Sequence, residues 1–133
     1  MASSRLLFLN LGHSLDHLFM LMFPAVAALA ATELSASYGE ILKLATGSFI
    51  AFGVFSLPMG WLADRFSRES MMTVFFLGIG GSMILTGFST EMWQIFGSLI
   101  LVGMFAAIYH PVGLAMVSQG GGDTGRRLGV NGV

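Results

Sequence analysis

Long apolar runs separated by short polar turns make up most of this sequence. Four runs are long enough for a helix that crosses a bilayer, which takes about 20 residues; they cover residues 6–31, 41–63, 71–88 and 92–117. Polar turns lie between them at residues 32–40, 64–70 and 89–91. The runs are too long for strands and do not alternate in polarity. The pattern therefore predicts an all-α integral membrane protein with four antiparallel transmembrane helices.

Capping residues indicate where two of these helices begin. Ser37 and Glu40 have the spacing of a capping box just before an apolar run. Ser89 precedes the fourth run, and a helix that begins there holds Glu91 in its first turn, where the helix dipole favours an acidic side chain. We therefore expect helices to begin at Ser37 and at Ser89.

Small residues and prolines also recur inside the runs. Pairs of small residues four positions apart occur at Gly47/Ala51, Gly78/Ser82 and Gly103/Ala107. Such pairs let two membrane helices approach closely. Prolines occur at Pro24, Pro58 and Pro111. Each proline removes one helical hydrogen bond, so each marks an expected bend.

The composition agrees with a membrane protein and excludes several other classes. Hydrophobic residues make up 55% of the chain and charged residues 10%, with a mean hydropathy of +0.81; soluble domains are less apolar and more charged. The net charge of −1 offers no basic surface for nucleic acid. The sequence has no cysteine for a disulfide or a thiolate metal site, and no Gly-x-x-x-x-Gly-Lys loop for a nucleotide.

Basic residues are distributed unequally between the two sides that the four runs define. On one side lie Arg5, Arg65, Arg68, Arg126 and Arg127. Only Lys43 belongs to the other side. Because basic residues accumulate on the cytoplasmic side of a membrane, this imbalance predicts a cytoplasmic N-terminus and a cytoplasmic turn at Asp64.

The last residues resemble the beginning of another helix. After a polar linker at residues 118–124 and the pair Arg126-Arg127, small and apolar residues resume at 128–133. This pattern predicts the start of a fifth helix from about residue 127. A frayed tail on a complete four-helix protein is the alternative.

The turn between the second and third runs carries the most specific motif. Residues 60–68 read Gly-Trp-Leu-Ala-Asp-Arg-Phe-Ser-Arg. This segment resembles the signature loop between helices two and three of the major facilitator superfamily, whose pattern is Gly-x-Leu-Ala-Asp-Arg-x-Gly-Arg-Arg/Lys. The matching residues are Gly60, Leu62, Ala63, Asp64, Arg65 and Arg68.

Two positions depart from this pattern, since Ser67 replaces the second glycine and Glu69 replaces the final basic residue. The resemblance implies a cytoplasmic gate that contacts the other half of a transporter, formed here by Gly60, Asp64, Arg65 and Arg68. It also implies that the chain supplies four helices, and the start of a fifth, of a twelve-helix fold.

Two further segments narrow the resemblance. The sequences His13-Ser-Leu-Asp-His17 in the first run and Ile108-Tyr109-His110-Pro111 in the fourth are similar to fosmidomycin-resistance-type drug exporters. This resemblance implies a secondary active transporter in a bacterial inner membrane that couples proton flow to the efflux of small amphipathic compounds. Its partners would be the lipid bilayer, a small-molecule substrate, protons and the remaining helices. It would have no cofactor and would not be an enzyme.

The first run carries ionisable residues in its interior. An ionised Asp16 exposed to lipid would cost roughly 2.5 to 3.5 kcal/mol, so such a residue normally faces a partner or a wet cavity. His13 and His17 are four residues apart, and Asp16 shares their helix face within an arc of about 100°. Imidazole gains and loses a proton near neutral pH, as a proton pathway requires. By resemblance, Tyr109 and His110 face this cluster and belong to the same pathway.

Other interpretations of these residues remain open. The carboxylate can serve structure alone, tied to its histidines, and helix packing can account for Tyr109 and His110. A zinc site needs more ligands than one helix face offers, and His110 is the only other histidine, so we predict no metal. Two alternatives to a transporter fragment are a complete four-helix dimeric antiporter that uses Asp16 and a membrane scaffold that transports nothing.

Overall fold

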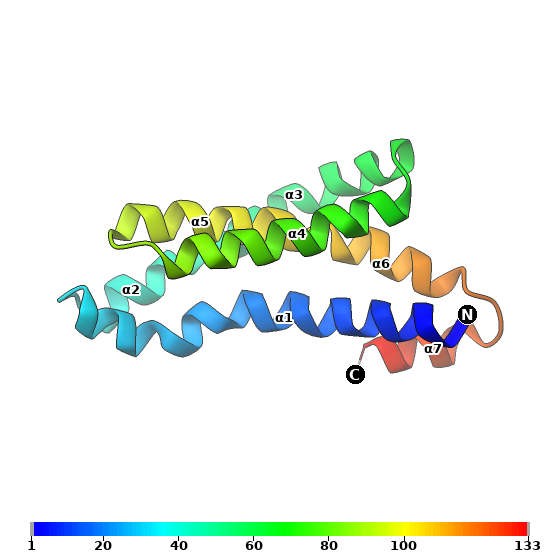
Figure 1. Ribbon diagram of the computed structural model, residues 1–133, viewed down its shortest axis with the longest axis horizontal. Coiled ribbons are helices and arrows are strands. Elements are labelled where there is room, and N and C mark those ends of the chain that lie inside the picture. Colours follow the sequence, from blue (N-terminus) through cyan, green and yellow to red (C-terminus); the bar gives the residue numbers. More distant parts are fainter. Residues whose placement is uncertain (1, 133) are drawn as a thin grey trace.

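The structure is a computed structural model that describes residues 2–132, which form seven helices and no strand. The helices are α1 (Ala2–Glu33), α2 (Tyr38–Leu44), α3 (Thr46–Arg65), α4 (Arg68–Gly87), α5 (Met92–Ala106), α6 (Tyr109–Ser118) and α7 (Thr124–Asn131). Figure 1 shows α1 running along the length of the molecule, with α7 beside its N-terminal part. The α3 and α4 helices both pack against α5.

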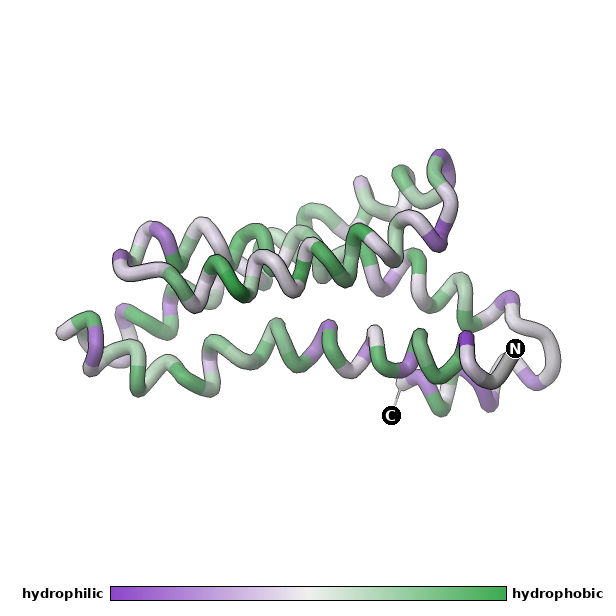
Figure 2. Tube along the Cα trace, in the orientation of Figure 1, coloured by the Kyte–Doolittle hydropathy of each residue, from purple (hydrophilic) through white to green (hydrophobic). Residues whose placement is uncertain are grey.

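Four helical stretches are long and apolar enough to cross a membrane. They are Ser4–Glu33, Tyr38–Arg65, Arg68–Gly87 and Met92–Ser118. Large apolar side chains also face outward, among them Leu57, which is 85% exposed, and Leu77, which is 73% exposed. Figure 2 shows hydrophobic residues along the helices and hydrophilic ones mostly near the turns. Lipid rather than water suits such a surface, and the predicted all-α membrane protein with four spans is confirmed.

Two of the spans are interrupted where continuous helices were expected. The helix predicted over 41–63 is divided at Ala45 into α2 and α3, and the helix predicted over 92–117 is divided at Ala107 into α5 and α6. Pro111 explains the second interruption, because proline has no N–H to donate to the carbonyl oxygen of Ala107. The other two prolines lie inside the unbroken helices α1 and α3.

The helix caps agree with the sequence at one turn and differ at another. Ser37 is the N-cap of α2 and forms the predicted capping box, in which the backbone N–H groups of Ser37 and Glu40 each donate to the other residue's side chain. The predicted start at Ser89 is wrong, because Glu91 is the N-cap of α5. The side-chain oxygen of Gln94 accepts the Glu91 N–H at 3.2 Å. This hydrogen bond fixes the N-cap at Glu91, so that the helix begins at Met92.

The turn between α3 and α4 is very short. Phe66 is the C-cap of α3 and Ser67 is the N-cap of α4, where the Ser67 hydroxyl accepts the backbone N–H of Ser70 at 3.1 Å. Glycine has no hydroxyl to do this, so the departure from the family pattern at Ser67 has a structural use. Glu69 forms an exposed ion pair with Arg5 at 3.3 Å. Such a pair adds little stability, but it shows that the start of α1 lies beside this turn.

Glycine allows the closest helix contact in the bundle. A Cβ atom on Gly103 of α5 would lie 1.9 Å from the backbone oxygen of Ser48 on α3, so a larger residue cannot occupy this position without moving a helix. Gly78 of α4 lies against the ring of Phe105 on α5 in a similar way, where an added Cβ would meet ring carbon at 2.2 Å. An added Cβ on Gly47 of α3 would likewise meet the ring of Phe96 on α5 at 2.8 Å. All three predicted small-residue pairs therefore lie at helix contacts.

The short helix α7 returns along α1. Asp123 caps it by accepting the backbone N–H of Arg126 at 3.0 Å. The helix accordingly begins at Thr124, whereas the sequence predicted a start near residue 127. Its residue Asn131 is 3% exposed and reaches both α1 and α6 with hydrogen bonds.

The two ends of the bundle differ in charge. The N-terminus, the turn between α3 and α4 and the loop between α6 and α7 lie at one end of the molecule, as Figure 1 shows. The guanidinium of Arg68 donates to the side chain of Gln119. This hydrogen bond joins the turn between α3 and α4 to the loop between α6 and α7. Lys43 lies in α2 at the opposite end. The five arginines thus share one end, as the predicted orientation requires; the cytoplasmic location of that end stays a prediction.

The contact at Gly103 leads to a test of helix packing. Gly103→Ala should lower the free energy of unfolding by about 1–3 kcal/mol, because the new methyl group overlaps the backbone of α3. Gly97→Ala, in the same helix, is the matched control: nothing lies within 4 Å of an added Cβ there, and alanine should stabilise the helix by about 0.5–1 kcal/mol. Reversible unfolding in detergent micelles measures both, and equal effects at the two positions would contradict the packing described here.

The Ser67 cap leads to a second test. Ser67→Ala should destabilise the chain by about 1 kcal/mol, whereas Ser67→Gly, which restores the residue of the family pattern, should cost only a few tenths. Ser89→Ala is the control, because the hydroxyl of Ser89, which is half-buried, donates to the preceding helix and caps no helix. We expect a change within about 0.5 kcal/mol. The same unfolding measurement applies. If the alanine variant is as stable as wild type, the Ser67 cap contributes nothing to the stability of the chain.

Candidate functional site

The predicted polar residues meet where α1 and α6 approach each other. Asp16 lies within about 4 Å, along the helix axis, of the middle of the span Ser4–Glu33, and His110 within about 8 Å of the middle of the span Met92–Ser118. The break between α5 and α6 places Tyr109 and His110 in the first turn of α6. The structure therefore brings all five predicted residues of the pathway to one place, near the centre of two spans.

Asp16 is the buried carboxylate of this cluster. Its side chain is 1% exposed, and its Oδ2 atom lies 3.5 Å from Nε2 of His110. Its Oδ1 atom has no hydrogen-bond partner among the described residues. The sequence placed Asp16 with the two histidines of its own helix, but its ion-pair partner in the structure is His110 on α6. The carboxylate therefore links two helices and keeps one oxygen free.

His17 forms the exposed side of the cluster, whereas His13 is half-buried. Nε2 of His17 lies 3.0 Å from Nε2 of His13. The ring of His13 stacks on that of Tyr109, with centroids 5.1 Å apart and planes 7° from parallel. The ring of His110 meets both histidines edge-on, at centroid distances of 5.5 Å and 5.9 Å. Three imidazoles from two helices thus share one contact region.

Tyr109 anchors the cluster to its surroundings. It is completely buried, and its hydroxyl donates to the backbone oxygen of Leu9 on α1 at 2.8 Å. The same hydroxyl lies 2.9 Å from the side-chain nitrogen of Asn131, which donates to it. That nitrogen also donates to the side chain of Asn10 at 3.0 Å. One network of hydrogen bonds therefore joins α1, α6 and α7.

The asparagines of this network are the members that sequence reasoning missed. The backbone oxygen of Asn131 accepts a hydrogen bond from Nδ1 of His13. Asn10 precedes His13 by three residues and so shares its helix face. That spacing was a readable signal for Asn10. Asn131 gave none, because it is a single polar residue among small and apolar ones and reaches the cluster only through the fold.

The predicted gate residues do not form one cluster. Gly60 lies inside α3 against Pro111 of α6, where an added Cβ would come within 3.4 Å. The guanidinium of Arg65 lies over the ring of Trp61, 4.1 Å from its centroid. Asp64 is exposed beside it, at the end of the bundle that carries the arginines. The turn therefore presents charge outward, and the structure does not test the gate itself.

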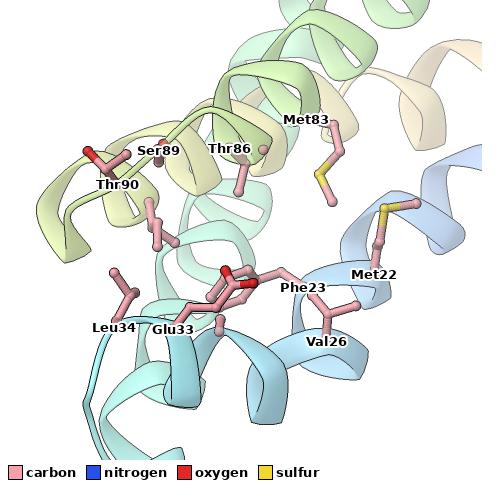
Figure 3. A pocket seen from close by; sticks show the side chains of 12 residues that line it. Met22, Phe23, Val26, Glu33, Leu34, Met83, Thr86, Ser89 and Thr90 are labelled. Carbon is pink, nitrogen blue, oxygen red and sulfur yellow. The ribbon is translucent and has the colours of Figure 1, made fainter.

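A pocket lies elsewhere, between the C-terminal part of α1 and the turn from α4 to α5. It has a volume of about 490 Å³, and Figure 3 shows Met22, Phe23 and Met83 on its walls. Among its lining residues, Glu33 is the one that carries a charge. None of the five polar residues lines it, so the pocket is separate from the polar cluster.

Comparison with known proteins identifies the class of the chain. Residues 9–132 match the family model described as Major Facilitator Superfamily. The chain is also similar to the puromycin resistance protein pur8 of Streptomyces alboniger, with 33% identity over 91 residues. That match covers 66% of this chain and 18% of the relative. No solved structure matches the chain.

The family match extends over both the Asp64 turn and the polar cluster, and it agrees with four spans in an all-helical chain. The resemblance to fosmidomycin-resistance-type exporters is not confirmed by these comparisons and stays a prediction. The chain spans about a fifth of the length of its puromycin-resistance relative. It belongs to the Major Facilitator Superfamily of membrane transporters.

Proposed function

We propose that this chain forms the first helices of a secondary active transporter that exports small amphipathic compounds in exchange for protons. The observation that carries the proposal is the polar cluster near the centre of two spans, with a buried carboxylate that keeps one oxygen free. Transporters of several folds hold their substrate and coupling ions near the middle of the membrane. Ionisable residues at that depth are costly, and they commonly mark such pathways.

The similarity to a resistance protein supports the direction of transport. The relative's name refers to resistance against puromycin, and a membrane transporter can confer resistance by moving a compound out of the cell. We therefore propose efflux of drug-like compounds, which would cross the site without any covalent chemistry. His13, Asp16, His17, Tyr109 and His110 would line the path of substrate and protons.

Proton flow is the proposed source of energy. The chain has no Gly-x-x-x-x-Gly-Lys loop that would hold a nucleotide. The uneven distribution of the arginines predicts a cytoplasmic N-terminus. The proposed location of the transporter is a bacterial inner membrane. In that orientation the turn with Asp64, Arg65 and Arg68 faces the cytoplasm, where it would act as a gate against further helices of the transporter.

Replacing the buried carboxylate tests the pathway. Asp16→Asn in the complete gene should lower the rate of proton-driven efflux at least about tenfold, equivalent to about 1.4 kcal/mol. Asparagine has the size of aspartate but holds no negative charge. Efflux is measured as the accumulation of puromycin, and of a panel of other amphipathic drugs, in efflux-deficient bacteria. The amount of transporter in the membrane is measured in parallel.

Glu33→Gln is the matched control, since it neutralises an exposed carboxylate at the far end of the same helix. It should leave efflux unchanged. If Asp16→Asn exports as fast as wild type at equal abundance, Asp16 has no part in the mechanism. If the wild type exports none of the compounds and moves no protons in liposomes, the exporter proposal fails and the scaffold alternative is favoured.

Tyr109 is expected to matter first for stability. Tyr109→Phe should lower the free energy of unfolding by about 1–3 kcal/mol, because the buried side chain of Asn131 loses its hydroxyl partner. Tyr38→Phe changes the other tyrosine of the chain, which is 52% exposed, and should stay within about 0.5 kcal/mol of wild type. Unfolding of both variants in detergent gives the comparison. Equal stability would show that the Tyr109 hydrogen bonds contribute nothing.

A further inference from the structure

The three histidines of the chain converge although they come from two helices. His13 and His17 lie on α1 and His110 on α6, and these are all the histidines in the sequence. One nitrogen from each of the three rings can be chosen so that these three atoms all lie within 4.8 Å of one another. The sequence offered two imidazoles on one helix face; the fold supplies the third.

The orientation of His13 is fixed by its surroundings. Its Nδ1 atom makes a hydrogen bond with the backbone oxygen of Asn131, and a carbonyl oxygen can only accept. Nδ1 of His13 must therefore carry the hydrogen. In the neutral ring this leaves the lone pair on Nε2, which is the atom that lies 3.0 Å from Nε2 of His17. A backbone carbonyl that orients a histidine in this way is the usual outer support of a metal ligand.

Asp16 supplies negative charge beside the three rings. Its Oδ2 atom lies 3.5 Å from Nε2 of His110, and its side chain is 1% exposed. Its Oδ1 atom lacks a hydrogen-bond partner among the described residues, which is costly for a buried carboxylate. A cation held by the histidines would offset that charge. Aspartate is also a common partner of metal-bound histidine.

We propose that His13, His17 and His110 bind a divalent transition-metal cation of the zinc type. Zinc sites with three histidines and one open position are well established, with zinc–nitrogen distances of about 2.0–2.1 Å. Tetrahedral angles then separate the ligand nitrogens by roughly 3.4 Å. The Nε2 atoms of His13 and His17 lie 3.0 Å apart, and the three ligand nitrogens all lie within 4.8 Å of one another, so each separation is within about 1.5 Å of this value.

The cation has a route to the site. His17 is exposed, and His13 and His110 are partly exposed, so the rings can be reached from outside the helix bundle. The fourth position is left to water or to Asp16. The cation would bridge α1 and α6, and its binding depends on neither a drug substrate nor proton flow. The metal site can therefore fail while the proposed efflux stands, and the reverse also holds.

Metal binding is tested on the purified chain in detergent, prepared without a polyhistidine tag. Titration calorimetry with zinc(II) should show one cation per chain. His17→Ala and His110→Ala should each weaken binding about 100-fold or more, since even loss of an outer support costs 10- to 100-fold. Cobalt(II) should acquire the intense visible absorption of a tetrahedral complex in wild type and lose it in both variants.

Two controls keep the result interpretable. His17 is exposed, so its replacement should leave the fold intact, which circular dichroism and size-exclusion chromatography verify. Glu33→Gln removes a distant carboxylate and should leave the affinity for zinc unchanged. Zinc affinity that is the same in wild type and both histidine variants overturns the proposal. A cobalt(II) spectrum that remains that of the hydrated ion also overturns it.

Discussion

Within a bilayer, a polar group has only the protein itself to bond with, because the hydrocarbon core holds no water. The hydroxyl of Tyr109 satisfies this condition for several groups at once, since it binds the backbone of α1 and the side chain of Asn131 on α7. The aromatic ring of Tyr109 also stacks on the ring of His13. Removing the Tyr109 hydroxyl would take a hydrogen-bond partner from the buried side chain of Asn131 and the direct link between α6 and the backbone of α1, so the shape of the cluster depends on it.

The close contact of α3 with α5 sets the frame in which that cluster can form. Gly103 lets the two backbones meet at Ser48, and a few residues later Pro111 ends the regular hydrogen bonding of the span. The short break turns the chain so that Tyr109 and His110 start a new helix facing α1. A small residue and a proline therefore act together: one sets how close the helices lie, and the other sets where the polar side chains point.

How much could be predicted from sequence depended on whether the responsible interaction is local. The four spans follow from apolar length alone, and the Ser37 capping box from residues three apart. The start predicted at Ser89 was wrong because the choice between neighbouring caps depends on which side chain, here Gln94, folds back on the turn. The partner of Asp16 and the place of Asn131 are contacts between distant segments. No periodicity within one helix carries information about them.

The same reasoning separates the Asp64 turn from the polar cluster. The turn has a recognisable pattern because its caps act over a few residues, and Ser67 has a local partner in Ser70. Glu69 is the exception, since its partner Arg5 comes from the start of α1. The cluster is assembled across more than a hundred residues, from Leu9 to Asn131. A motif can therefore report family membership from one turn. The proposed binding site consists of imidazoles and a carboxylate whose mutual positions exist only once α1, α6 and α7 have packed.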